Sequence, residues 1–126
     1  MRYMMLVTAP ADPGPVPPAL VEARNKWVAK ETAAGAFIDG AEFIRGKGPK
    51  SIRLQGGIVT ATDGPFAEAK EVLGGYMLFE FPRHEAAEKS AQTFLELHAN
   101  HWPGWDGAVT LLPVTAVQTH NAQQKP

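Results

Sequence analysis

The segment GYMLFEFPRHEAAEKSAQTFLELH, residues 75–98, predicts a β-strand followed almost at once by an α-helix. Its first part, residues 75–81, is a run of mostly aromatic and aliphatic side chains, which is typical of a buried strand. Pro82 ends this run, because proline has no N–H group to donate to a neighbouring strand. From His84 to His98, apolar side chains recur at steps of three and four residues, which predicts a helix with one apolar face.

The part of the chain before this segment predicts the same kind of unit. Residues 2–8 are rich in aromatic and aliphatic side chains and predict a strand, after which three prolines break the chain into a loop. A helix is predicted over residues 19–34, since two prolines can occupy its first turn and Gly35 can end it. Residues 36–44 predict the next strand, with a kink at Gly40.

A hairpin is predicted between the two units. Residues 51–54 and 58–62 carry β-branched side chains on either side of a Gly-Gly pair, a pattern that favours a hairpin. Residues 63–66 then predict a turn, and residues 67–73 predict either a single helical turn or an ordered loop. The last strand is predicted over residues 109–117.

The predicted elements indicate a fold class. Without the hairpin their order is β-α-β followed by β-α-β, which is the split β-α-β pattern of ferredoxin-like folds. We therefore predict an α+β fold in which helices cover one face of an antiparallel sheet. The side chains predicted for the other face are largely apolar too, so that face also needs a cover. A second copy of the chain supplies one most simply, and two facing sheets make a dimeric α/β barrel.

Composition and length narrow the class of protein. The 126 residues fit one domain, predicted over residues 1–118, and a polar tail over residues 119–126. The formal net charge of −1 gives no reason to expect binding to nucleic acid or to an acidic membrane surface. The absence of cysteine from the sequence excludes disulfides, a thiolate nucleophile and cysteine-ligated metals, and it agrees with a cytoplasmic location.

The sequence contains no clear targeting signal and none of several common catalytic motifs. The apolar run near the N-terminus is short for a signal peptide, and a first strand accounts for it. No stretch of the sequence approaches the roughly 20 apolar residues of a membrane-spanning helix. The sequence also lacks the motifs of dinucleotide-binding proteins, P-loop proteins, serine hydrolases and zinc peptidases.

A long motif in the middle of the chain is similar to the YCII-related proteins that carry a DGPF motif. It reads ATDGPFAEAKE over residues 61–71 and is followed by Gly74-Gly75-Tyr76. The opening MRYMM and the segment from His98 to Gly107, which contains HWPGW, resemble that family too. The resemblance implies a dimeric α/β barrel with a cavity between sheet and helices near the subunit contact.

The resemblance also bears on chemistry and regulation. Relatives in the wider YCII-like group are associated with a His-Asp pair and lyase-type chemistry on small ring compounds. The helix predicted here over residues 19–34 has no histidine and offers Arg24 and Trp27 instead, which departs from that pattern. Some relatives lie beside sigma-factor genes, which suggests a regulatory association.

Asp63 is the predicted catalytic residue, and two interpretations of it stay open. An Asp before Gly-Pro can close a turn by accepting backbone N–H hydrogen bonds, which needs no ligand. Alternatively its carboxylate acts as a base or anchors a ligand. Gly64 and Pro65 make a rigid corner of this segment, and such corners can present side chains such as Asp63 and Phe66 to a cavity.

Further candidates lie on both sides of this corner. Lys70 and Glu71 are either solvated surface charges or turn toward the cavity, where Lys70 would bind an anionic ligand. Tyr76 either places its hydroxyl in the pocket or packs as an ordinary strand residue. The predicted ligand-binding residues are Arg24, Trp27, Asp63, Phe66, Lys70, Glu71, Tyr76 and His98.

Two histidines near the end of the second predicted helix have either a metal-binding or a structural interpretation. His98 and His101 are three residues apart, so they could share a metal on a helix, with Asp106 as a third ligand. Pro103 and Gly104 predict that the helix ends there, which spoils that geometry. We therefore predict no metal site and no cofactor, and we expect Trp102 and Trp105 to pack a loop over the core or across the dimer.

Two functions follow from these observations. The first is a homodimer that binds a small organic molecule in a cavity of each protomer, with weak acid–base chemistry of a lyase type. The alternative is a non-enzymatic interaction module with a protein partner, associated with transcriptional regulation. The sequence leaves open whether the protein is an enzyme.

Overall fold

The computed structural model of the chain describes residues 1–44, 50–63 and 71–115. Within these ranges strands and helices alternate in the pattern β-α-β, β-β, β-α-β, and the predicted α+β fold is confirmed. The bounds are β1 Arg2–Pro10, α1 Pro18–Ala33, β2 Phe37–Glu42, β3 Lys50–Gln55, β4 Ile58–Asp63, β5 Glu71–Glu80, α2 His84–His101 and β6 Ala108–Val114. The tail predicted over residues 119–126 lies outside the described residues.

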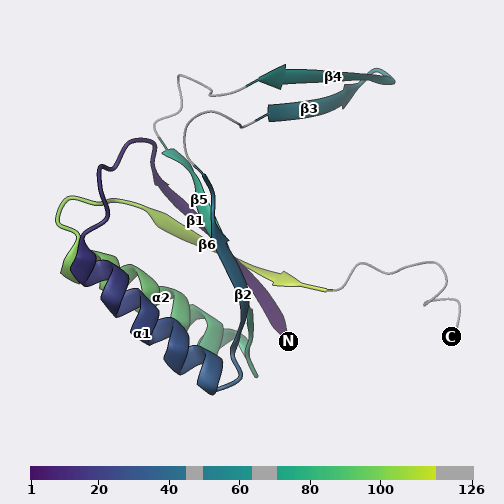
Figure 1. Cartoon of the computed structure of the whole chain (residues 1–126). Coiled ribbons are helices and arrows are strands. Elements are labelled where there is room, and N and C mark those ends of the chain that lie inside the picture. The colour runs from purple at the N-terminus through teal and green to yellow at the C-terminus, as the bar shows by residue number, and fades with distance from the viewer. Residues whose placement is uncertain (45–49, 64–70, 116–126) are drawn as a thin grey trace, which may run out of the picture.

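Four of the strands form one antiparallel sheet in the order β2-β5-β1-β6 (Figure 1). Each β-α-β unit contributes two strands that are not direct neighbours, because a strand of the other unit lies between them. This interleaving gives the split β-α-β topology predicted from the sequence. Strands β3 and β4 form a separate two-stranded sheet.

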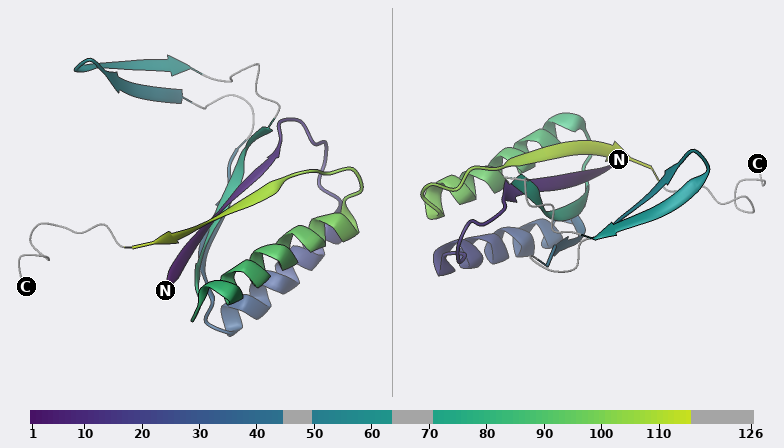
Figure 2. Two further views of the ribbon diagram at one scale, coloured as in Figure 1. Left: turned by 180° about the vertical axis from the view of Figure 1, so that it is seen from behind. Right: turned by 90° about the horizontal axis from the view of Figure 1, so that it is seen from above.

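Both helices lie side by side on one face of the four-stranded sheet (Figure 2). Helix α1 has Pro18 in its first turn and ends before Gly35, whose φ of 78° suits a residue without a side chain. The hydroxyl of Ser90 on α2 donates a hydrogen bond to Glu31 on α1, at 3.3 Å. No helix in the described ranges is both long and apolar enough to cross a membrane.

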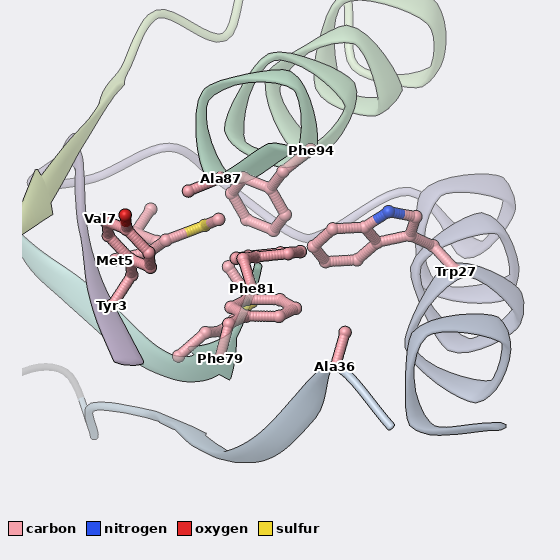
Figure 3. Close-up of a cluster of buried hydrophobic side chains, with 10 residues drawn as sticks. Tyr3, Met5, Val7, Trp27, Ala36, Phe79, Phe81, Ala87 and Phe94 are labelled. Atoms are coloured by element: carbon pink, nitrogen blue, oxygen red, sulfur yellow. The ribbon is translucent and has the colours of Figure 1, made fainter. Parts of the chain in front are cut away.

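The core fills the space between the helices and the sheet. Every second residue of β1, starting at Tyr3, is buried against the helices, which is the period expected of a strand with one covered face. Phe79 is 0% exposed and lies at the centre of a group of aromatic rings (Figure 3). Its ring lies 5.1 Å from Phe81, 5.5 Å from Phe37 and 5.7 Å from Trp27, measured between centroids.

The opposite face of the sheet, which we call the open face, is also apolar. Met4 of β1 lies between Leu78 of β5 and Leu112 of β6, and Leu6 follows on the same side. These side chains are partly or well exposed, and Leu112 retains 40% of its accessible surface. The chain therefore leaves a continuous apolar surface without cover from the described residues, as the sequence predicted for this face.

The structure corrects several predicted boundaries, among them the end of β2, which lies at Glu42 where the sequence predicted residue 44. Residues 71–73 belong to β5 and form neither a helical turn nor a loop, because they pair with the end of β1, which runs to Pro10. Helix α2 continues to His101, beyond the predicted end at His98. Strand β6 ends at Val114, where its pairing with β1 also ends, so Thr115 is not part of the strand, and the predicted strand end at Val117 lies outside the described residues.

Candidate functional site

A cavity of about 470 Å³ lies between the two helices and the adjoining part of the sheet. This volume is in the range that is typical of small-molecule sites. The cavity has aromatic walls and a few polar groups. The aromatic residues that line it are Trp27, Phe37, Tyr76, Phe94, Trp102 and Trp105, and the polar residues include Arg24, Asn25, Glu42 and His98.

Arg24 brings a positive charge to this cavity from α1. Its side chain is only 20% exposed, and its nearest charged partner is Glu42, whose carboxylate lies 3.8 Å away. That distance is at the long end for an ion pair and too long for a hydrogen bond. Because a guanidinium stays charged at any physiological pH, Arg24 can bind an anionic group that enters the cavity.

His98 is the second polar group that the fold places at the cavity. It is 3% exposed and its ring packs between Phe94, at 4.6 Å, and Trp105, at 4.3 Å. Its Nδ1 lies 3.0 Å from the carbonyl oxygen of Phe94. A carbonyl only accepts hydrogen bonds, so Nδ1 must carry the proton, and in the neutral ring Nε2 has a free lone pair.

Nε2 of His98 is accessible, and His98 lines the cavity. Among the described residues no fully buried side-chain nitrogen or oxygen lacks a hydrogen-bond partner. The bond to Phe94 occupies Nδ1 of His98, and Nε2 has no such partner in the described part of the chain. It follows that Nε2 retains accessible surface on a residue that lines the cavity.

The surroundings of His98 keep it neutral. Burial lowers the pKa of His98 below its ordinary value of 6.5 because an imidazolium loses hydration in this place. The hydrogen bond to the Phe94 carbonyl acts in the opposite direction and raises the pKa of His98. The positive charge of Arg24 lowers this pKa further, and the negative charge of Glu42 raises it and so partly offsets the effect of Arg24. The net direction is downward, so at neutral pH His98 is an uncharged hydrogen-bond acceptor and a potential base.

This lowered pKa predicts a pH dependence of stability. The unfolded chain binds a proton at His98 near pH 6.5, whereas the folded chain resists it. The contribution of His98 is therefore fully present above pH 6.5 and is lost as the pH falls from there through the folded pKa. Urea unfolding of the natural protein and His98→Asn between pH 5 and 8 checks this, and the variant should show a weaker dependence.

A matched control is available on the same helix. His101 lies three residues further along α2 and does not line the cavity. His101→Asn should keep the pH dependence of the natural protein. If the free energy of unfolding changes equally with pH in His98→Asn and in the natural protein, His98 binds its proton alike in the folded and unfolded states, which contradicts the prediction.

The structure brings together some of the residues predicted from the sequence. Arg24, Trp27, Tyr76 and His98 all line the cavity. Phe66 and Lys70 lie outside the described residues. Asp63 and Glu71 are described as the end of β4 and the start of β5, but their side chains are not described, so their predicted functions stay predictions.

Tyr76 borders the cavity with its hydroxyl already engaged. The hydroxyl donates a hydrogen bond to Asp39 Oδ2 at 3.3 Å, and Asp39 does not line the cavity. The negative charge of Asp39, followed by burial and this hydrogen bond, raises the pKa of Tyr76 above its usual value. Tyr76 is therefore a weaker candidate for direct ligand contact than Arg24 or His98.

Sequence reasoning missed three parts of the cavity wall. Trp102 and Trp105 were expected to pack a loop, and they also line the cavity. Trp105 folds back over Gly107, where any Cβ would collide with its ring. Glu42 was not singled out: in the sequence it is only an acidic residue within the strand predicted over residues 36–44, and the structure places it opposite Gly75 at the end of β2.

The histidines of α2 do not form part of a metal cluster in the described structure. Across residues 1–44, 50–63 and 71–115, no group of three or more His, Cys, Asp or Glu side chains is arranged to hold a metal ion. One ring nitrogen of His98 instead hydrogen-bonds the backbone carbonyl of Phe94, and the ring packs against the tilted rings of Phe94 and Trp105.

Comparison with models of protein families identifies a match over most of the chain. The family model described as the YCII-related domain matches residues 1–101 of the chain. The matched range contains β1 to β5 and all of α2, and it includes Arg24, Glu42 and His98. No curated protein matches the chain.

Proposed function

Because the chain belongs to the YCII-related domain family, we propose that it works as a homodimer that binds a small organic acid in the cavity of each protomer. The observation that carries this proposal is that Arg24 and a neutral His98, whose Nε2 has no hydrogen-bond partner among the described residues, line the same aromatic cavity. Isolated polar groups at apolar walls are the usual composition of a small-molecule site.

The lining indicates the chemistry of the ligand. A guanidinium at the cavity favours a carboxylate or a similar anion, because such hydrogen bonds are charge-assisted. The aromatic side chains favour a flat, apolar body, which can stack on a ring. The lone pair of His98 favours a ligand with an O–H or N–H group.

The same two residues suit acid–base chemistry of the lyase type. His98 Nε2 can take a proton from a bound ligand, and Arg24 can stabilise the negative charge that this leaves on the ligand. The imidazolium formed in this way is disfavoured by burial and by Arg24, so it readily returns the proton to a departing group. Asp63 remains the sequence-based candidate for a second acid–base residue.

The homodimer is supported by the open face. Met4, Leu6, Leu78 and Leu112 form an apolar surface on the side of the sheet that the helices leave uncovered. Contiguous apolar surface of this kind marks interaction sites in soluble proteins. Two such faces in contact make a dimeric α/β barrel. The cysteine-free sequence agrees with a location in the cytoplasm.

A thermal-shift screen of organic acids tests the ligand proposal. The natural protein, Arg24→Gln and Asp63→Asn are screened in parallel, and a ligand at 100 times its dissociation constant should stabilise the natural fold by about 2.7 kcal/mol. If the thermal shift is lost in Arg24→Gln, the ligand binds in the cavity that Arg24 lines. If it is lost in Asp63→Asn, the ligand binds at the DGPF motif, as the sequence predicts. Hits that bind Arg24→Gln unchanged contradict the proposal, and a broad library without hits favours the interaction module.

A further inference from the structure

Strands β3 and β4 form a ribbon with one apolar and one polar face. We call this the β3–β4 ribbon (Lys50–Gln55 and Ile58–Asp63). Its register sets Leu54 opposite Val59 and Ile52 opposite Ala61, which puts these four side chains on one face, and Lys50 shares that face at the start of β3. The other face carries Ser51, Arg53, Gln55, Ile58, Thr60 and Thr62. Such alternation is typical of strands with one buried face.

The apolar face of the ribbon is uncovered within the described chain. Leu54 is 70% exposed, Ile52 69% and Val59 66%. The ribbon stands apart from the four-stranded sheet and the helices (Figure 1). A two-stranded hairpin is marginally stable on its own in water, so this ribbon needs a surface to pack against.

The ribbon is a regular hairpin despite this exposure. Gly56 and Gly57 have φ angles of 59° and 79°, and two successive positive φ angles are the signature of the tight turn that suits twisted strands. The turn fixes the register, and the register fixes which side chains share a face. The apolar face is thus specified by the sequence and does not arise from a disordered loop.

The area of the open face favours a second copy of the chain as the partner. A sheet of four strands with about seven paired residues each offers a flat area of roughly 450 Å². A standard interface takes about 800 Å² of accessible surface from each partner. The β3–β4 ribbon adds about 200 Å² of flat area per copy, so the two surfaces together approach a standard interface.

The sequence position of the ribbon connects it with the open face. It is inserted between β2 and β5, which are neighbours in the sheet. Exposed apolar side chains flank the insertion: Phe43 follows β2 and is 42% exposed, and Leu73 near the start of β5 is 53% exposed. Apolar surface therefore continues from the sheet toward the ribbon.

We propose that the β3–β4 ribbon is an arm that packs its apolar face, Ile52, Leu54, Val59 and Ala61, on the second copy of the chain. This inference rests on the homodimer proposed above, and it adds a contact that is separate from the open face. Each copy then provides one arm, and two symmetric arms are the arrangement expected of a two-fold dimer.

Two neighbouring residues provide a matched test. Val59 and Ile58 are 66% and 65% exposed but lie on opposite faces of the ribbon. We compare the natural protein, Val59→Ser, the double variant Leu54→Ser/Val59→Ser and Ile58→Ser by sedimentation over a dilution series. The double variant should raise the dimer dissociation constant about tenfold or more, Val59→Ser should raise it less, and Ile58→Ser should leave it nearly unchanged.

The possible outcomes distinguish a failure of the arm proposal from a failure of the homodimer proposal. A natural protein that stays monomeric at every concentration contradicts the homodimer and, with it, the arm. A natural dimer whose dissociation constant is the same in all variants contradicts the arm alone. Equal weakening by Ile58→Ser and Val59→Ser also contradicts it, because the effect would then not follow the apolar face.

A second measurement does not depend on removing an apolar side chain. The chain has no cysteine, so Val59→Cys and Ile58→Cys each introduce a single labelling site for an environment-sensitive fluorophore. The label at position 59 should report an apolar environment at high protein concentration and water on dilution, whereas the label at position 58 should report water throughout. Concentration-independent emission from both labels in a protein that sediments as a dimer would overturn the arm.

Discussion

Replacing Phe79 by alanine is expected to lower the free energy of unfolding by about 3–5 kcal/mol, the usual cost of removing a large aromatic side chain from a core. Phe79 has no exposed surface, and three aromatic rings lie within 5.7 Å of its ring centroid. It joins α1, through Trp27, to the strands beneath. Because the free energy of unfolding of a whole domain is only about 5–15 kcal/mol, this one substitution removes a large share of the stability of the protein.

Urea or thermal unfolding measures this effect, with Phe43→Ala as the control. Phe43 is 42% exposed, and within the described part of the chain its ring has one aromatic neighbour, Tyr76, at 6.1 Å. Its replacement should cost the monomer less than about 1 kcal/mol, as is usual for exposed positions. A Phe79→Ala variant no less stable than Phe43→Ala would show that the ring cluster does not hold the helices on the sheet.

The strands and helices of this fold could be predicted because each has a strong local pattern. The alternation through Tyr3, Met5 and Val7 identifies a strand with one covered face, and the same alternation predicts the apolar open face. The prediction of a helical turn or loop at residues 71–73 was wrong because the structure of these residues depends on a strand that is distant in the sequence. These residues are strand because β1 extends far enough to pair with them, and a charged residue such as Glu71 gives no sign of this.

The candidate site could be predicted only in part, because it depends on contacts between distant segments. His98 continues the apolar period of α2, so its burial was visible in the sequence. The free Nε2 of His98 was not visible in the sequence, because it follows from the hydrogen bond that Nδ1 makes to a backbone carbonyl within the helix. Arg24, Glu42 and His98 come from α1, β2 and α2, and only the sheet order brings these elements around one cavity. A sequence pattern does not contain that juxtaposition.

Arg24→Gln should weaken binding of an organic acid in the cavity by about 10- to 100-fold, because hydrogen bonds to charged groups contribute about 1.5–3 kcal/mol. Glu42→Gln should act in the opposite direction. In the free protein the carboxylate of Glu42 lies 3.8 Å from the Arg24 guanidinium and competes with an incoming anion. Because Glu42 is well exposed, its competition is weak, and its removal should raise affinity by no more than about fivefold.

Calorimetric titration of the strongest acid from the screen measures both effects, with Lys26→Gln as the control. Lys26 lies on α1 two residues after Arg24, but it is 78% exposed and pairs with Glu22 at 3.3 Å. Removing its charge changes the net charge by the same amount as Arg24→Gln and should leave the affinity nearly unchanged. Equal losses in the Lys26 and Arg24 variants would mean that the acid responds to the net charge of the protein. If the affinity falls in Arg24→Gln and rises in Glu42→Gln, the carboxylate of the ligand replaces that of Glu42 at the Arg24 guanidinium. The cavity would then be a site for organic anions.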